Sequence, residues 1–180
     1  MTDLIDSDGF RANVAIVLSN DDAQVFWAGR VGRRGWQFPQ GGIKNNETPI
    51  EAMYRELQEE IGLQPDDVEV LGKTDDWLKY KLPKRYQRSR AEPLCIGQKQ
   101  LWYLLKLTGD QNAIRFDKGN TPEFDRWCWV DFWYPLRKVI FFKRNVYSSA
   151  LEELSNHLFD GTPPSKKQTK RRSPVRRLAI

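Results

Sequence analysis

Residues 41–63, GGIKNNETPIEAMYRELQEEIGL, contain the clearest helix signal in the sequence. Thr48 suits an N-cap, Pro49 suits the first helical position, and Glu51 can complete a capping box with Thr48. Gly62 is typical of a residue that ends a helix in a left-handed conformation. The sequence therefore predicts a helix that begins after Thr48 and ends at Gly62.

This helix separates apolar from acidic residues. At about 100° per residue, one narrow face carries the residues expected in the core, which are Ile50, Met53, Tyr54, Leu57 and Ile61. Glu56, Glu59 and Glu60 share a different face, where like charges destabilise a helix by roughly 0.2–0.5 kcal/mol per pair. Arg55 offsets part of this repulsion. A hard divalent cation could supply the remaining positive charge, because Mg²⁺ binds a few carboxylates plus substrate phosphates. The alternative is an acidic face exposed to solvent.

The flanking sequence is rich in strand patterns. Alternating or continuous apolar residues predict strands at 13–19, 24–28, 36–38, 68–71, 77–82, 98–108 and 126–130. Residues 40–42, with two glycines, predict irregular backbone. Helical spacing returns at 143–159. Many strands with two firm helices predict an α/β fold, with a mixed sheet flanked by helices.

Composition excludes several classes of protein. The 180 residues fit one domain, and no apolar run approaches the roughly 20 residues that span a membrane. The acidic N-terminal ten residues do not resemble a secretory signal, so we expect a cytoplasmic protein. One histidine, His157, and two distant cysteines exclude multi-histidine mechanisms, a disulfide framework and a cysteine-rich zinc site.

The positive charge is concentrated at the C-terminus. The net charge is +5, yet residues 161–180 contain seven basic residues and no acid, and residues 1–160 contain 22 basic and 24 acidic residues. We therefore predict a folded domain at 1–160 and a basic, disordered tail at 161–180. The tail either improves solubility or attracts RNA and acidic surfaces.

The spacing within residues 41–63 also resembles a known signature. Its fixed residues match the 23-residue box of the Nudix hydrolases at Gly41, Glu47, Arg55, Glu56, Leu57, Glu59, Glu60, Gly62 and Leu63. The resemblance implies an α/β/α sandwich around a mixed sheet. It also implies hydrolysis of a nucleoside diphosphate linked to another moiety, with Mg²⁺ or Mn²⁺ as the cofactor.

The same resemblance implies residue roles. Glu56, Glu59 and Glu60 would be metal ligands, and Gly41 would offer its carbonyl. Arg55 would orient the carboxylates, and Glu47 would support the start of the helix. Outside the box, the resemblance indicates Glu123 as a general base or an additional metal ligand. With a single histidine in the chain, we expect a carboxylate to act as the base.

Segments outside the box narrow the substrate. Residues 36–42 (WQFPQGG), 77–84 (WLKYKLPK) and 121–125 (TPEFD) resemble a bacterial branch of the family that acts on RNA. The resemblance implies conversion of 5′-triphosphate RNA to 5′-monophosphate RNA, which promotes RNA decay, with release of pyrophosphate or of two phosphates in steps. It places substrate contacts at Arg11, Arg30, Tyr80, Gln98, Phe142 and Lys143.

Other functions stay open at this point. The same chemistry could act on diadenosine polyphosphates or nucleotides. A non-catalytic RNA-binding module on this fold is disfavoured, because all the glutamates of the box are present. An adaptor that binds acidic proteins through the tail could coexist with an enzyme. We expect a monomer with a possible protein activator, and neither a membrane nor DNA as a partner.

Overall fold

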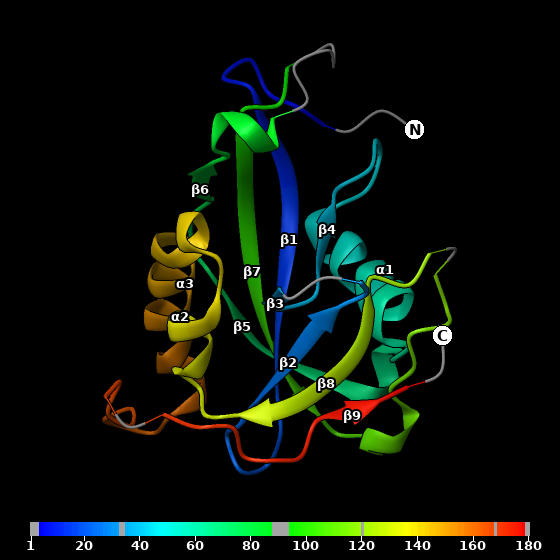
Figure 1. The fold of residues 1–180 in the computed structure, drawn as a ribbon, viewed down its shortest axis with the longest axis vertical. Coiled ribbons are helices and arrows are strands. Elements are labelled where there is room, and N and C mark those ends of the chain that lie inside the picture. The colour runs from blue at the N-terminus through cyan, green and yellow to red at the C-terminus, as the bar shows by residue number, and fades with distance from the viewer. Residues whose placement is uncertain (1–3, 33–34, 88–93, 120, 168, 179–180) are drawn as a thin grey trace.

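The computed structural model describes residues 4–32, 35–87, 94–119, 121–167 and 169–178. A mixed sheet runs through its centre in the order β5-β7-β1-β2-β8-β9, with β3 paired to β2, β4 to β1 and β6 to β7 (Figure 1). The strands are β1 (Phe10–Ser19), β2 (Val25–Arg30), β3 (Trp36–Gln37), β4 (Gln40–Gly42), β5 (Val68–Lys73), β6 (Leu78–Lys81), β7 (Gly97–Leu107), β8 (Phe124–Val130) and β9 (Arg176–Arg177).

Helices cover both faces of the sheet, which confirms the predicted α/β architecture. Figure 1 shows α1 (Pro49–Ile61) on one side, and α2 (Tyr134–Lys138) and α3 (Arg144–Leu158) on the other. Alternate residues of β1 point to opposite faces, as the pleat of a strand requires. Val14 and Ile16 belong to the core under α1, whereas Ala15 and Val17 belong to the core under α3. The molecule therefore has three layers and two cores.

The helix α1 forms as its capping residues predict. The Thr48 side chain accepts a hydrogen bond from the Glu51 N–H, and the Glu51 carboxylate accepts one from the Thr48 N–H at 2.8 Å. Gly62 ends the helix with φ of 75°. The predicted core face is correct for Met53, Leu57 and Ile61 but wrong for Ile50, which is 44% exposed. In the first turn of the helix, Ala52 rather than Ile50 packs into the core.

Residues 40–42 form a strand, so the prediction of irregular backbone there is wrong. β4 pairs antiparallel with β1, with Asn13 opposite Gly42 and Ala15 opposite Gln40. β1 pairs with β2 at the far end of β1, where Ser19 lies opposite Val25. Pairing with a neighbouring strand thus overrides the low strand propensity of glycine at this place. The short helix α2 was not predicted either.

The C-terminal segment also differs from its prediction, because its described residues pack against the sheet. Arg176 and Arg177 pair antiparallel with β8, and the Asp131 N–H donates to the Lys170 carbonyl at 3.0 Å. The Asp131 carboxylate accepts hydrogen bonds from the Lys170 N–H and from the Arg172 side chain. Without this segment β8 would be an exposed edge strand. We call residues 161–167 and 169–178 the C-terminal strap. The domain boundary at residue 160 stays a prediction.

Membrane insertion through a helix finds no support in the fold. Among the described residues, no helix combines the length and the apolar character needed to cross a bilayer.

The capping box of α1 generates a stability prediction. Thr48→Ala removes the side-chain acceptor at the N-cap, so we expect the free energy of unfolding to fall by about 1 kcal/mol. Urea unfolding followed by circular dichroism measures this change. Thr162→Ala, at an exposed residue beyond α3, is the matched control. Equal unfolding midpoints for the two variants would contradict the assigned cap.

Candidate metal and substrate site

A cavity of about 880 Å³ lies beside β4 and α1 and collects most of the predicted site residues. Those that line it are Arg11, Arg30, Gly41, Glu56, Glu60, Tyr80, Gln98, Glu123, Phe142 and Lys143. Arg55 and Glu59, also predicted, do not line it. We call this space the substrate cavity. Residues far apart in sequence meet here because β1, β2, β4, β6, β7 and the end of α1 all contribute to its walls.

Glu56 lies directly against the backbone of Gly41. A Cβ atom added to Gly41 would come within 2.2 Å of the Glu56 carboxylate carbon and both its oxygens. Only glycine therefore allows this approach of β4 to α1. Glu56 is 8% exposed, and burial raises the pKa of its carboxyl, although the neighbouring Arg55 guanidinium opposes that rise. The predicted role of the Gly41 carbonyl as a ligand stays a prediction.

Glu60 brings a second acidic group to the same wall. Its carboxylate accepts a hydrogen bond from the Gln40 N–H at 2.9 Å. Burial raises the pKa of Glu60 well above its ordinary value, and the charge of Glu56 raises it further. The positive charge of Lys143 lowers the pKa of Glu60. Two neighbouring acidic groups whose pKa values are both raised by burial form a site that favours a bound cation.

Arg55 acts as a brace for these carboxylates. Its guanidinium donates to the Glu47 carboxylate at 2.7 and 2.9 Å and to the Gly42 carbonyl at 2.8 Å. It also donates to Glu56, and to Glu59 at 3.1 Å. Its hydrogen bonds are the main cause of the lowered pKa of Glu47. This arrangement fits the orienting role predicted for Arg55 and the supporting role predicted for Glu47.

Glu59 points away from the substrate cavity. Its carboxylate lies between Arg55 and Lys44, with the Lys44 Nζ at 3.5 Å, and its side chain is 44% exposed. Within the described part of the chain, no group of three or more acidic, histidine or cysteine side chains is placed to hold a metal ion. Glu56 and Glu60 still fit Mg²⁺, which binds proteins through one or two carboxylates plus waters and substrate phosphates.

Glu123 contributes a further acidic side chain, just before β8. The Arg30 Nε donates to its carboxylate at 2.6 Å, and the Gln37 Nε2 lies at 3.5 Å. Glu123 also raises the pKa of Glu60 through its charge. Arg30, predicted as a substrate contact, and Glu123, predicted as a base or metal ligand, therefore form an ion pair across the cavity wall.

Lys143 is a buried cation in this cavity. Its Nζ donates to the Gln40 Oε1 at 3.0 Å and lies 3.4 Å from the Gln37 Oε1. Burial is the main cause that lowers the pKa of Lys143 to about 8, and the charge of Arg30 contributes. The glutamines that hold Lys143 were not predicted as site residues. Gln37 could have been found as a polar side chain between two aromatic residues, whereas Gln40, beside a proline and a glycine, has no such signal.

An aromatic and amide wall lies next to Lys143. The rings of Tyr80 and Phe142 stack with centroids 6.1 Å apart, and the Tyr80 hydroxyl donates to the Gln98 Oε1 at 2.6 Å. Gln100 donates to the Asn13 Oδ1 at 2.8 Å deeper in the sheet. The wall thus presents an aromatic face beside hydrogen-bonding groups, an arrangement that suits a nucleobase.

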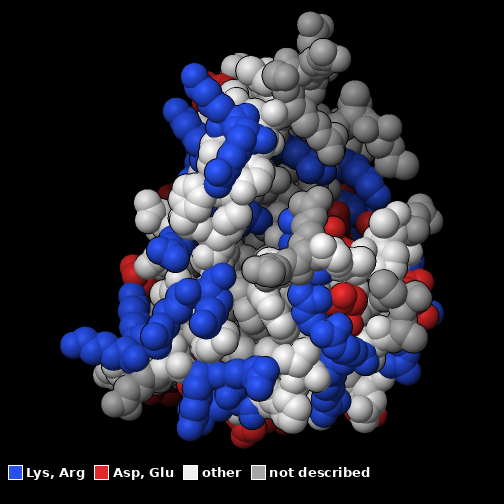
Figure 2. Space-filling model, in the orientation of Figure 1, with Lys and Arg blue, Asp and Glu red and all other residues white. Residues whose placement is uncertain are grey.

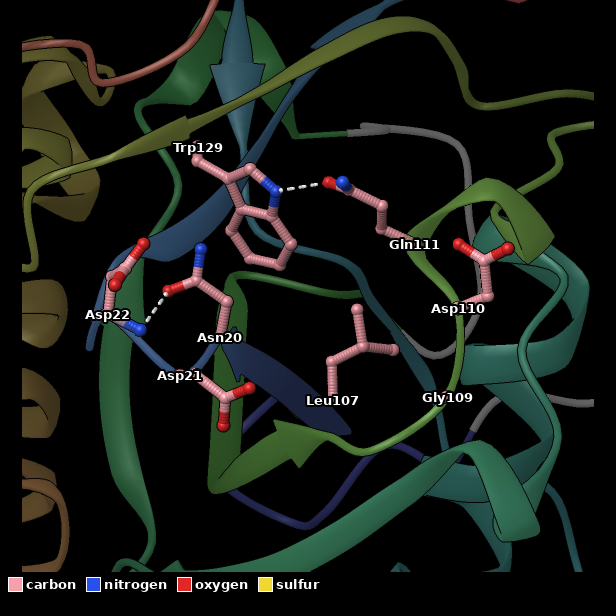
Figure 3. A pocket seen from close by; sticks show the side chains of 8 residues that line it. All are labelled: Asn20, Asp21, Asp22, Leu107, Gly109, Asp110, Gln111 and Trp129. Atoms are coloured by element: carbon pink, nitrogen blue, oxygen red, sulfur yellow. Dashed lines mark hydrogen bonds between the residues drawn. The ribbon is translucent and has the colours of Figure 1, made fainter.

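Another cavity, of about 340 Å³, lies at the opposite end of β1 (Figure 3). The Asn20 side chain there accepts hydrogen bonds from the Asp22 and Gln24 N–H groups, and Trp129 donates to Gln111 at 3.0 Å. The two bonds to Asn20 close the turn between β1 and β2. No residue of the predicted site lines this cavity.

Comparison with known proteins shows which family the chain resembles. The model of the NUDIX domain family matches residues 9–149. The RNA pyrophosphohydrolase of Alkalilimnicola ehrlichii is 56% identical over 176 residues, which cover 96% of this chain and 97% of that protein. The RNA pyrophosphohydrolase of Thioalkalivibrio sulfidiphilus is 54% identical over 171 residues, which cover 94% of this chain and 99% of that protein.

Solved structures share the fold at low sequence identity. The Escherichia coli dihydroneopterin triphosphate pyrophosphohydrolase aligns with a TM-score of 0.60 and 17% identity, over 77% of this chain and 92% of that chain. A Caenorhabditis elegans Ap4A hydrolase aligns with a TM-score of 0.60 and 14% identity, over 82% and 96% respectively. At this identity the likeness shows the α/β/α fold alone.

The contact between Gly41 and Glu56 generates a prediction for metal binding. Gly41→Ala forces the Glu56 carboxylate away from β4, so we expect Mn²⁺ affinity to fall about 10- to 100-fold. Electron paramagnetic resonance of free Mn²⁺ measures the affinity. Gly35→Ala is the control, because Gly35 lines the same cavity and its added Cβ would make only an ordinary contact, 3.8 Å from Arg30. Similar Mn²⁺ affinities for both variants would contradict a metal site at Glu56.

Proposed function

The chain belongs to the Nudix hydrolase family, and we propose that it is an RNA pyrophosphohydrolase that converts 5′-triphosphate RNA ends to 5′-monophosphate ends. Relatives named RNA pyrophosphohydrolase, 54–60% identical over most of the chain, carry this proposal. The gathering of ten predicted site residues around one cavity supports it.

The metal would be Mg²⁺ or Mn²⁺. Glu56 and Glu60 would hold it together with the Gly41 carbonyl, and Glu123 would serve either as a further ligand or as the base. Glu59 could join this set only by exchanging its ion pairs with Arg55 and Lys44. When bound, a divalent cation neutralises charge on phosphate oxygens and lowers the pKa of the attacking water.

The remaining residues of the cavity would bind and orient the RNA end. Lys143, Arg30 and Arg11 supply positive charge for the phosphates, and Arg guanidinium groups match phosphate oxygens in pairs. The Phe142 ring and Tyr80 offer a stacking face, and Gln98 offers a hydrogen bond to a base edge. In this arrangement, the triphosphate reaches the carboxylates while the base stays against the aromatic wall.

Hydrolysis also requires a base for the attacking water. Glu123 would accept the water proton as the oxygen attacks phosphorus, and the phosphoanhydride bond would break to release pyrophosphate. His157 cannot serve, because it lies against Gly72 on the β5 side of the sheet and does not line the cavity. Release of two phosphates in successive steps would use the same groups.

The cellular role follows from the reaction. Removal of pyrophosphate would leave a 5′-monophosphate end and so promote RNA decay in the cytoplasm. We propose a monomer, which a protein activator could stimulate.

A comparison of substrates tests this function. With Mg²⁺, we expect a much larger kcat/KM on 5′-triphosphate RNA than on diadenosine tetraphosphate, because only RNA continues beyond the bound end. Glu56→Gln should lower kcat about 1,000-fold, since loss of metal stabilisation costs several kcal/mol. Chromatographic separation of the 5′-monophosphate product measures both rates. Preference for the dinucleotide by orders of magnitude would overturn the RNA assignment but retain the chemistry.

The pKa of Lys143 generates a pH prediction. A Lys143 pKa of about 8 means that the side chain is charged below pH 8 and becomes neutral above it. The kcat/KM reports groups of the free enzyme. We therefore expect the ratio of wild-type to Lys143→Arg kcat/KM to fall about ten-fold between pH 7 and pH 9, because arginine stays protonated. A constant ratio from pH 6.5 to pH 9.5 would show that phosphate binding does not depend on this titration.

A further inference from the structure

We propose that the C-terminal strap and the cavity beneath it bind the RNA nucleotides that follow those held in the substrate cavity. This inference rests on the proposed function, because it assigns a path to the rest of the RNA chain. A cavity of about 350 Å³ carries it, and Trp27, Trp36, Cys128, Tyr134, Lys138, Arg171 and Val175 line this space. We call it the strap cavity.

The strap cavity lies next to the substrate cavity. Trp36 and Lys138 line both spaces, so one aromatic ring and one cation form their common wall. Arg171 and Val175 complete the strap cavity from the C-terminal side. An RNA chain that leaves the substrate cavity past Trp36 therefore meets the strap.

The lining of the strap cavity has the chemistry of a single-stranded RNA site. Trp36 and Tyr134 are half-buried, and a base can stack on an exposed aromatic face whatever its identity. Cations accompany both rings, with the Arg126 guanidinium 5.4 Å from the Trp36 centroid and the Lys138 Nζ 5.8 Å from the Tyr134 centroid. Aromatic rings that can stack on bases thus lie beside cations.

The strap itself adds an ordered row of positive charge. It contains seven basic residues and no acid, and Lys and Arg side chains gather along the lower edge in Figure 2, where Figure 1 shows the strap. Its pairing with β8 and its bonds to Asp131 hold the strap in place. Arg171 and Arg177 are exposed. Because the strap is already ordered, binding along it loses little conformational entropy.

RNA fits this surface better than an acidic protein does. Charge alone would attract either partner. The aromatic faces and the shared wall with the substrate cavity favour a polymer that carries bases and enters that cavity by its 5′ end. Acidic protein binding is therefore the alternative outcome of the test.

The test compares a 5′-triphosphate dinucleotide with a 5′-triphosphate 12-mer of RNA. For Arg171→Glu and for Tyr134→Ala, we expect KM for the 12-mer to rise roughly five-fold or more, with little change in kcat. KM for the dinucleotide should not change, because it does not reach the strap cavity. Lys73→Glu, which makes the same charge change on β5 at the opposite edge of the sheet, is the control. Melting temperatures establish that each variant is folded.

Binding of a 12-mer with a 5′-hydroxyl end, measured by fluorescence anisotropy, provides a readout without hydrolysis. We expect Arg171→Glu to weaken it and Lys73→Glu to leave it unchanged, with a salt slope lower by about 0.7 for each lost phosphate contact. Equal KM changes on both substrates, or none, would overturn the inference. The inference would also be overturned if Arg171→Glu weakened the binding of polyglutamate but left RNA affinity unchanged. Failure of the wild type to convert either RNA, with anisotropy as expected, would instead overturn the proposed function.

Discussion

The enclosure of Glu56 and Glu60 within one wall is the constraint on which the rest of this site depends. Buried carboxylates are costly unless a cation neutralises them, and removal of a partner from a buried ion pair costs roughly 3–5 kcal/mol. Arg55 meets this requirement from one side, through its bonds to Glu47, Glu56 and the Gly42 carbonyl. It thereby ties α1, β4 and the loop before the helix together. The other side of the carboxylates faces the cavity, where a metal and a phosphate chain can complete the neutralisation.

The parallel pairing of β1 with β7 places further polar side chains beside this wall. The register places Arg11 beside Gln98 and Asn13 beside Gln100, so two polar residues of each strand fall near the cavity end of the sheet. A slip of one residue would turn every side chain of a strand to the opposite face. The apolar residues further along β1 fix the register, because they alternate between the two cores. Core packing thus determines the position of groups that contact substrate.

Sequence reasoning predicted the local features and missed several long-range ones. Capping residues and helical periodicity locate α1, because both act within a few residues, and the box within it indicated Glu56 and Glu60. The same box grouped Glu59 with them, but periodicity does not show that Arg55 and Lys44 hold its carboxylate outside the cavity. Similarly, the glycines of β4 indicated irregular backbone. That prediction failed because tertiary structure, which local sequence does not show, pairs β4 with β1. The ion pair of Arg30 with Glu123 joins residues 93 positions apart, which no local pattern can reveal.

The strap shows why composition misjudged the C-terminus. A basic segment rich in proline and serine has too few apolar residues to form a core of its own, and on that ground it is predicted to be disordered. It needs no core here, because β8 offers unpaired backbone groups, and Asp131 and Glu152 offer carboxylates. Arg176 also lies over the ring of Trp127, 5.0 Å from its centroid. Contacts with the folded domain, rather than contacts within the strap, therefore order the strap. Most of its cations remain exposed after docking, so the fold itself keeps positive charge beside the route that leads out of the substrate cavity.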